Sequence, residues 1–313
     1  MIPRALTPAA FAARDGGAAI RSFAGETMGT YWSLQAVSPP ADAAPGVQAV
    51  LDRVVAQMSQ WEATSDLSRF NRAAPGVWRD VPVELAHVLE AALAVGRASG
   101  GAFEPALGRI TEQWGFGSMG PVDRVPDNPP ATGRIEFDAE RRQARRGEDA
   151  LLDLSGIAKG YGVDAAAEWL LAKGVRHFLI EVGGELRGEG IRPDGQPWWV
   201  DVELPPSWPG AGWRIALHDL SVATSGDYRR GFEVDGQRYS HSFDPRTGRP
   251  IVNGVRSATV IHRNCMMADG WATALTVLGP EKAIALADAQ GLAACVLARG
   301  HEFTSQAWRA MLE

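Results

Sequence analysis

The runs HFLIEV (residues 177–182), WWVDVEL (198–204), WRIALHDLSVAT (213–224) and VRSATVI (255–261) decide the fold class of this chain. Each run is short and apolar, and glycine or proline turns separate it from the next. Because no helical stretch stands between consecutive runs, the strands are expected to pair antiparallel and not through parallel crossovers. The pattern predicts an α+β fold built on a mostly antiparallel sheet.

Helical periodicity appears before and after these strands. Apolar residues recur every three to four positions in five segments, which we predict as helices: Val47–Trp61, Val83–Ala98, Ala158–Lys173, Met266–Leu278 and Glu281–Ala289. Further strands are predicted at Gly29–Val37, where Trp32, Leu34 and Ala36 share one face, and at Leu292–Leu297. We expect the helices to pack on one side of the sheet, in two closely joined subdomains.

The chain of 313 residues divides into a flexible leader, residues 1–25, and one domain, residues 26–313. Pro121–Arg146 is rich in proline, aspartate and arginine, and is predicted to be an insertion or a surface hairpin. The first residues lack the apolar run of a signal peptide and a lipid-anchor cysteine, and no transmembrane segment is expected. The sequence as it stands therefore predicts a cytoplasmic protein; a different start would allow a periplasmic one.

Composition excludes several classes of function. The formal net charge of −6 argues against a general nucleic-acid binder, which would need a surplus of lysine and arginine. The two cysteines, Cys265 and Cys295, form no zinc motif and are expected to be unpaired core thiols. The sequence contains no P-loop, no GxSxG elbow and no HExxH motif.

A strand-to-helix turn at Asp153–Asp164, DLSGIAKGYGVD, is the first candidate site. Backbone N–H groups at such a turn converge on one spot, and the helix dipole favours an anion there. Lys159 in the first helical turn adds a charge suited to phosphate. Taken alone, the segment is equally compatible with an ordinary capped helix that carries a surface lysine.

Three further polar segments interrupt the apolar pattern. Residues 223–230, ATSGDYRR, read either as part of a binding cleft or as a hydrogen-bonded turn with basic flanks. His241, in YSHSFDPRTGRP at residues 239–250, has the pKa range for proton transfer, although a lone histidine is more often structural. Asp269 and Thr273 lie four residues apart, so a helix places both oxygens on one face, where they would suit Mg²⁺; taken alone, the pair is also compatible with an aspartate N-cap and an incidental threonine.

Together these segments resemble the ApbE family, the FAD:protein FMN transferases. The matching strings appear in the family's order: ETMGT (26–30), MSQW (58–61), SRFN (68–71), GAFE (101–104), WGF (114–116), DLSGIAKG (153–160), EVGGE (181–185), ATSGDY (223–228), HSFDPRTG (241–248), AD (268–269) and ATAL (272–275). They span residues 26–280, which is most of the chain.

The resemblance implies a reaction. FAD is bound as substrate, and Mg²⁺ (or Mn²⁺) holds its pyrophosphate. A threonine hydroxyl of an acceptor protein attacks the FMN-side phosphorus, AMP leaves, and FMN stays on the acceptor as a phosphoester. Pyrophosphate cleavage of this kind needs charge neutralisation and a positioned nucleophile, which agrees with the residues quoted above.

The resemblance also assigns site residues. Asp269, Thr273 and the backbone carbonyl of Gly156 would hold the metal. His241 would lie nearest the proton transfer, and Asp269 and His241 would be the catalytic pair. The implied flavin contacts are Met28, Trp61, Ala102, Phe103, Glu104, Asp153, Lys159 and His241, with the turn at residues 224–228 lining the same cleft. The chain departs from the family at Trp61, where tyrosine is usual, and at Glu104, where aspartate is usual.

Two other functions would use the same residues. In a Mg²⁺-dependent FAD pyrophosphatase, water replaces the acceptor threonine and the products are FMN and AMP. A non-catalytic FAD-binding or flavin-delivery protein would bind FAD without turnover. The Asp269–Thr273 pair favours catalysis, because binding alone needs no metal that polarises a pyrophosphate.

Overall fold

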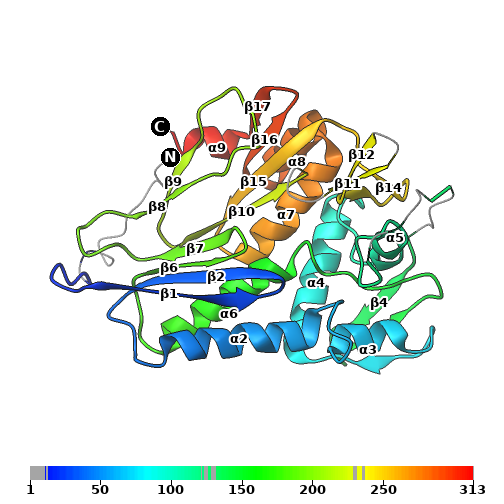
Figure 1. Cartoon of the computed structure of the whole chain (residues 1–313), viewed down its shortest axis with the longest axis horizontal. Coiled ribbons are helices and arrows are strands. Elements are labelled where there is room, and N and C mark those ends of the chain that lie inside the picture. The colour runs from blue at the N-terminus through cyan, green and yellow to red at the C-terminus, as the bar shows by residue number, and fades with distance from the viewer. Residues whose placement is uncertain are drawn as a thin grey trace.

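An antiparallel sheet of eight strands forms the centre of the computed structural model, which describes residues 11, 13–120, 122, 126–127, 132–227, 231–234 and 237–312 (Figure 1). Every neighbouring pair in this sheet is antiparallel, as the sequence predicts. In spatial order the strands are β1 (Ile20–Thr27), β2 (Thr30–Val37), β6 (Phe178–Val182), β7 (Glu185–Glu189), β10 (Leu220–Gly226), β15 (Val255–His262), β16 (Ala293–Ala298) and β17 (His301–Thr304).

The helices follow the predicted periodicity closely. Their bounds are α2 (Ala43–Met58), α3 (Asp66–Arg72), α4 (Val83–Ala98), α5 (Gly108–Gln113), α6 (Ala158–Ala172), α7 (Cys265–Leu278), α8 (Pro280–Gln290) and α9 (Gln306–Ala310). One face of the sheet carries α2 and α6 over β2 and β6, and α7 and α8 over β15 and β16. The buried faces of these helices are the apolar positions that repeat in the sequence.

The opposite face of the sheet has a different cover. Strands β8 (Trp198–Asp201) and β9 (Arg214–Leu217) pair with each other in a separate two-stranded ribbon. This ribbon and the short helix α9 pack on the face that bears Ile261, Cys295 and Leu297. The expectation that helices occupy one side therefore holds for the long helices but not for α9, whose Trp308 is fully buried on the other side.

The N-terminal edge of the sheet begins earlier than the sequence predicts. Strand β1 starts at Ile20 and pairs along its full length with β2, so residues 20–25 belong to the sheet and not to the leader. The strand was hard to recognise because it lies at the edge of the sheet. Most of its side chains stay at least partly exposed, so its sequence lacks a clear alternation of apolar and polar residues.

Three smaller sheets complete the described part of the chain. Their strands are β3 (Arg79–Asp80), β4 (Ile135–Asp138) and β5 (Gln143–Arg146) in one sheet, β11 (Gly231–Val234) and β12 (Gln237–Ser240) in another, and β13 (Phe243–Asp244) with β14 (Arg249–Pro250) in the third. The β4–β5 hairpin confirms the hairpin expected within Pro121–Arg146, although residues 121, 123–125 and 128–131 lie outside the described part.

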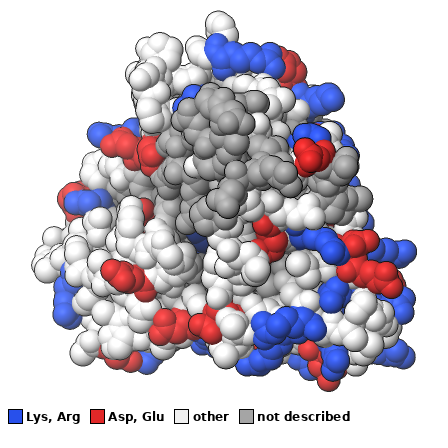
Figure 2. All heavy atoms as spheres, turned by 45° about the vertical axis from the view of Figure 1, so that its right-hand side comes forward, with Lys and Arg blue, Asp and Glu red and all other residues white. Residues whose placement is uncertain are grey.

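The cysteines, the helix lengths and the surface charge agree with the composition of the chain. Cys265 and Cys295 are buried free thiols, as predicted. Among the described residues, none of the helices combines the length and the apolarity needed to cross a bilayer. On the face drawn in Figure 2, acidic and basic side chains are interspersed and no broad basic field is visible, in keeping with the net charge of −6.

Candidate active site

Two antiparallel helix segments build the centre of the candidate site. The apolar run before Asp153 leads into the turn at Ser155–Gly156, and α6 begins at Ala158. Helix α7 runs past the start of α6 in the opposite direction, so that Gly156 faces Thr273 and Gly160 faces Asp269. The carboxylate and the hydroxyl lie one turn apart on α7, as their spacing predicts.

A cluster of oxygen atoms forms where the turn meets α7. The Thr273 hydroxyl donates to the carbonyl of Gly156 at 3.3 Å and lies 3.1 Å from the hydroxyl of Ser225 on β10. One turn away, Asp269 Oδ2 accepts a hydrogen bond from the N–H of Gly160 at 3.0 Å. We call Gly156, Ser225, Asp269 and Thr273 the oxygen cluster. The residues that the resemblance implies as metal ligands therefore lie within one helical turn of one another, and Ser225 contacts one of them, Thr273.

Two glycines allow this close approach. A Cβ atom at Gly160 would lie 2.4 Å from the carbonyl oxygen of Cys265, a distance that side chains do not tolerate. A Cβ atom at Gly156 would lie 3.0 Å from Thr273 Oγ1 and 3.3 Å from the ring of Phe103. The missing side chains thus let the turn and the start of α6 pack directly against α7.

Burial and one lysine control the charge of Asp269. The residue is only 3% exposed, and this burial raises the pKa of its carboxyl above the ordinary value. The Lys159 ammonium and the Gly160 N–H oppose that rise. Lys159 is itself held by Glu185 on β7, with 2.6 Å between Nζ and Oε1. The site therefore combines a buried carboxylate with a cation fixed at the start of a helix.

The donor atoms of the oxygen cluster fit a hard cation. A carboxylate, a hydroxyl and a backbone carbonyl are the oxygen ligands that Mg²⁺ and Mn²⁺ prefer. Within the described residues, no group of three or more His, Cys, Asp or Glu side chains could hold a metal ion. A cation at this site would therefore combine one carboxylate with neutral oxygens, and substrate or water would complete its coordination.

The carboxylate of Asp153 stabilises the Ser155–Gly156 turn through two hydrogen bonds. The carboxylate is buried; its Oδ1 accepts from the N–H of Ser155 at 2.9 Å, and its Oδ2 accepts from the hydroxyl of Thr111 on α5 at 3.2 Å. These two bonds fix the shape of the Ser155–Gly156 turn and connect it to α5. No local spacing in the sequence marks Thr111 as a partner of Asp153, because 42 residues separate the two.

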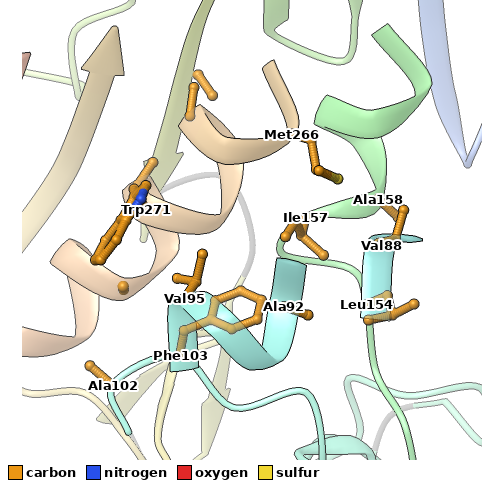
Figure 3. Close-up of a cluster of buried hydrophobic side chains, with 14 of the residues drawn as sticks. Val88, Ala92, Val95, Ala102, Phe103, Leu154, Ile157, Ala158, Met266 and Trp271 are labelled. Carbon is orange, nitrogen blue, oxygen red and sulfur yellow. The ribbon is translucent and has the colours of Figure 1, made fainter. Parts of the chain in front are cut away.

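Apolar side chains pack beside the oxygen cluster on the α4 side. Phe103 is 4% exposed and lies in the core between α4, α6 and α7 with Val95, Ile157 and Trp271 (Figure 3). Its neighbour Ala102 is buried in the same cluster. Met28, in the turn between β1 and β2, directs its thioether methyl towards α6, within 3.0 Å of where a Cβ at Gly162 would stand. Phe103 thus lies beside the turn before α6 and Met28 beside Gly162 of α6, whereas Ala102 is placed only within the larger core cluster.

The remaining predicted contacts lie further out. The ring centroid of His241, on the loop between β12 and β13, is 6.3 Å from that of Phe116, which follows α5. Trp61 lies on the loop after α2 and is 52% exposed, and no contact with the oxygen cluster is described for it. Tyr228, in the predicted cleft lining, lies outside the described residues, whereas Thr224 bonds to Thr259 and stays within the sheet.

Glu104 faces α4. Its carboxylate accepts from the N–H of Ala106 at 2.9 Å and lines a cavity of about 210 Å³ together with Leu93, Gly96, Arg97 and Pro105. Burial raises the pKa of this carboxyl.

A larger cavity of about 360 Å³ lies between α3, β3 and α4, where Arg69, Arg79 and Leu85 are among its lining residues. No residue predicted for the site lines that larger cavity.

Comparison with known proteins decides the family. The model of the ApbE family matches residues 28–296 of this chain. The chain belongs to the ApbE family. The FAD:protein FMN transferase of Vibrio cholerae is 37% identical over 278 residues, covering 85% of this chain and 83% of the relative, and that of Haemophilus influenzae is 33% identical over 304 residues, covering 89% and 86%. Membership of this family makes the protein a transferase.

Solved structures agree on the fold. The apo crystal structure of the flavinyl transferase ApbE of Pseudomonas stutzeri matches with a TM-score of 0.85 and 34% identity, covering 94% of this chain and 97% of that one. The flavin transferase ApbE of Vibrio cholerae gives a TM-score of 0.83 at 32% identity, covering 94% and 99%. The ApbE family member therefore has the α+β architecture of its relatives along nearly its whole length.

Proposed function

We propose that the protein transfers FMN from FAD to a threonine hydroxyl of an acceptor protein, with release of AMP, in a reaction that requires Mg²⁺ or Mn²⁺. The observation that carries the proposal is the oxygen cluster at the start of α6, with Lys159 beside it. Relatives that cover most of this chain are named FAD:protein FMN transferase, which supports the same reaction.

The metal would be held by Asp269, Thr273 and the carbonyl of Gly156. When bound, it neutralises charge on the pyrophosphate oxygens, which lowers the barrier to attack at phosphorus. The ionised carboxylate of Asp269 is the only anionic ligand in this set, so the metal keeps most of its positive charge for the substrate. Ser225 orients the Thr273 hydroxyl through their 3.1 Å contact.

Lys159 and the turn before α6 would bind the phosphates. The N-terminus of α6 presents the positive end of the helix dipole, which favours an anion there. Glu185 contacts the Lys159 ammonium, with 2.6 Å between Oε1 and Nζ, which fixes this positive charge beside the turn where a phosphate would bind. Both features stabilise the added negative charge of the transition state more than that of free FAD.

The other contacts would orient the flavin part of FAD. Met28 would give an apolar contact near α6, the buried Ala102 and Phe103 would form the apolar backing of the flavin site, and Trp61 offers an exposed ring for stacking. Asp153 would act through the turn that it supports, and Glu104 through the segment after Phe103. In this arrangement FAD lies with its pyrophosphate at the oxygen cluster.

The chemical step forms one bond and breaks one. The acceptor threonine oxygen attacks the FMN-side phosphorus, the bond from that phosphorus to the bridging oxygen breaks, and AMP leaves with the bonding electrons. The threonine proton passes to a base, for which we propose His241, because imidazole is the side chain that most often accepts a proton in catalysis. Substitution of water for threonine would give FMN and AMP as free products.

Product analysis tests the proposal against its alternatives. The protein is incubated with FAD and Mg²⁺, with and without an acceptor domain that carries a threonine flavinylation motif, and AMP and FMN are measured by chromatography. Acceptor-dependent AMP release without free FMN is expected. Equal release of AMP and FMN in both reactions would identify a pyrophosphatase, and intact FAD throughout would identify a binding protein.

A further inference from the structure

The N-terminus of α7 is capped by a carboxylate from another helix. The residue that precedes the helix, Asn264, makes no capping hydrogen bond with its side chain, and the first turn of α7 contains no acidic residue. Instead Asp164 of α6 accepts from the N–H of Cys265 at 3.0 Å through Oδ1 and from the N–H of Met266 at 2.9 Å through Oδ2. Both acceptor atoms of this carboxylate are thus used by the first turn of α7.

This cap is the third member of a regular series. Gly156, Gly160 and Asp164 follow one another at four-residue spacing from the turn into α6, and their partners Thr273, Asp269 and Cys265 follow at the same spacing in the reverse direction along α7. The series is a ladder of three contacts between antiparallel segments. Its first two contacts contain the proposed metal ligands, and the third fixes where α7 begins.

The sheet holds Asp164 in place. Arg187 of β7 is only 9% exposed, and its guanidinium contacts Asp164 Oδ1 at 3.1 Å and Glu189 Oε1 at 2.6 Å. A planar guanidinium between two carboxylates restricts the rotation of both. Arg187 also contacts Glu168, one turn further along α6, at 3.0 Å, but the side chain of Glu168 is 65% exposed. Asp164 is therefore anchored from the sheet side and α7 is anchored through Asp164.

We propose that Asp164 is a positioning residue that sets the register of α7 against α6 and thereby the spacing of the Gly156, Asp269 and Thr273 oxygens. The inference rests on the proposed function for the identity of the metal site. Met266, whose N–H Asp164 holds, lies beside the ribbon of α6 in Figure 3, so the contact is continuous with the apolar core. A shift of α7 along α6 would change all three contacts of the ladder together.

The decisive variant is Asp164→Asn, which keeps the size of the side chain. Asparagine has one acceptor oxygen in place of two, and its amide would point N–H groups at an N–H of α7 or at Arg187. We expect Mg²⁺ affinity, measured by calorimetric titration with MgCl₂ alone and without FAD, to fall by about tenfold or more. Glu168→Gln is the matched control, because Glu168 shares Arg187 but none of its described contacts reaches α7; its Mg²⁺ affinity should match that of the wild type.

The unfolding temperature measured in EDTA distinguishes a positioning role of Asp164 from a purely stabilising one. A cap that only stabilises the fold would lower this temperature in Asp164→Asn and leave Mg²⁺ affinity unchanged, which would overturn the proposal. If Asp164→Asn does not fold, Asp164→Glu answers the question. It keeps the charge and the acceptors but adds one methylene, so Mg²⁺ affinity should fall while the unfolding temperature stays close to that of the wild type.

The same experiment keeps the two proposals apart. If the wild type transfers FMN but both Asp164 variants bind Mg²⁺ as the wild type does, the positioning role is wrong and the proposed function stands. If the wild type binds Mg²⁺ but transfers no FMN, the proposed function is wrong, and weaker Mg²⁺ binding in Asp164→Asn still supports the positioning role. Absence of Mg²⁺ binding by the wild type would overturn both.

Discussion

The N–H of Gly160 donates a hydrogen bond of 3.0 Å to Oδ2 of Asp269, across the contact between α6 and α7. This bond uses one oxygen of a buried carboxylate and leaves the other for a cation. It also requires the two helices to approach so closely that Gly160 has no room for a side chain. The bond therefore connects the packing of the core to the chemistry of the proposed metal site.

Replacement of Gly160 tests this packing. In Gly160→Ala the new methyl would overlap the carbonyl of Cys265, so the free energy of unfolding should fall by about 1–3 kcal/mol, as for other overpacked cores. Gly162→Ala is the control on the same helix, because its methyl would meet the side-chain ends of Met28 and Leu51 and not a backbone atom. Urea denaturation measures both; equal stability of the two variants would contradict the account.

The hydroxyl of Thr273 can be removed without changing the shape of the side chain. Thr273→Val should raise the Mg²⁺ concentration for half-maximal transfer by about tenfold, equivalent to about 1.4 kcal/mol of lost binding. Thr276→Val is the matched control, because the Thr276 hydroxyl on the same helix donates to the Ala272 carbonyl within α7. A similar Mg²⁺ dependence in both variants would argue against Thr273 as a ligand.

Burial of Asp269 predicts a pH effect with a definite sign. In the metal-free protein the pKa of this carboxyl is raised above 3.8, so the stability that its protonation contributes is lost as pH rises through the native pKa. Mg²⁺ competes with that proton, so the stabilisation by Mg²⁺ should grow over the same interval. Unfolding temperatures with and without Mg²⁺, from roughly pH 4 to 8, measure this; a pH-independent difference, or one retained in Asp269→Asn, would contradict it.

If His241 is the base, its loss should slow FMN transfer far more than it weakens FAD binding. His241→Ala should slow FMN transfer by about 100-fold or more, since general bases contribute at least that much, while the dissociation constant of FAD changes by less than about threefold. His301→Ala, at the exposed edge strand β17, serves as the control. Rapid-quench kinetics and equilibrium FAD binding give the two quantities; parallel losses would make His241 a binding residue.

Much of the fold could be predicted because its signals are local. Helix α4 has the predicted bounds Val83–Ala98, and the face of β2 with Trp32, Leu34 and Ala36 is buried as expected. Strand β1 was missed because an edge strand needs little apolar alternation. The separate β8–β9 ribbon could not be foreseen either, because an apolar run does not say which sheet it joins.

The candidate site, like the fold, could be predicted from the sequence only where its signals are local. The spacing of Asp269 and Thr273 predicts that they share one face of a helix. In the structure Thr273 contacts Gly156 in the turn and Asp269 contacts Gly160 in the first turn of α6. The contact of Ser225 with Thr273 spans 48 residues, and the cap of Asp164 on Cys265 spans 101. Such partners depend on how the elements pack, and no local spacing in the sequence records them.

Mass spectrometry of the acceptor tests the central claim most directly. The purified protein is incubated with FAD, Mg²⁺ and an acceptor domain that carries a flavinylation threonine, beside reactions with EDTA and with Asp269→Asn. We expect the acceptor to gain the mass of one FMN phosphoester in the complete reaction, and to gain almost none in the other two. An acceptor whose mass stays unchanged with the wild-type protein and Mg²⁺, or rises equally with Asp269→Asn, would contradict the account.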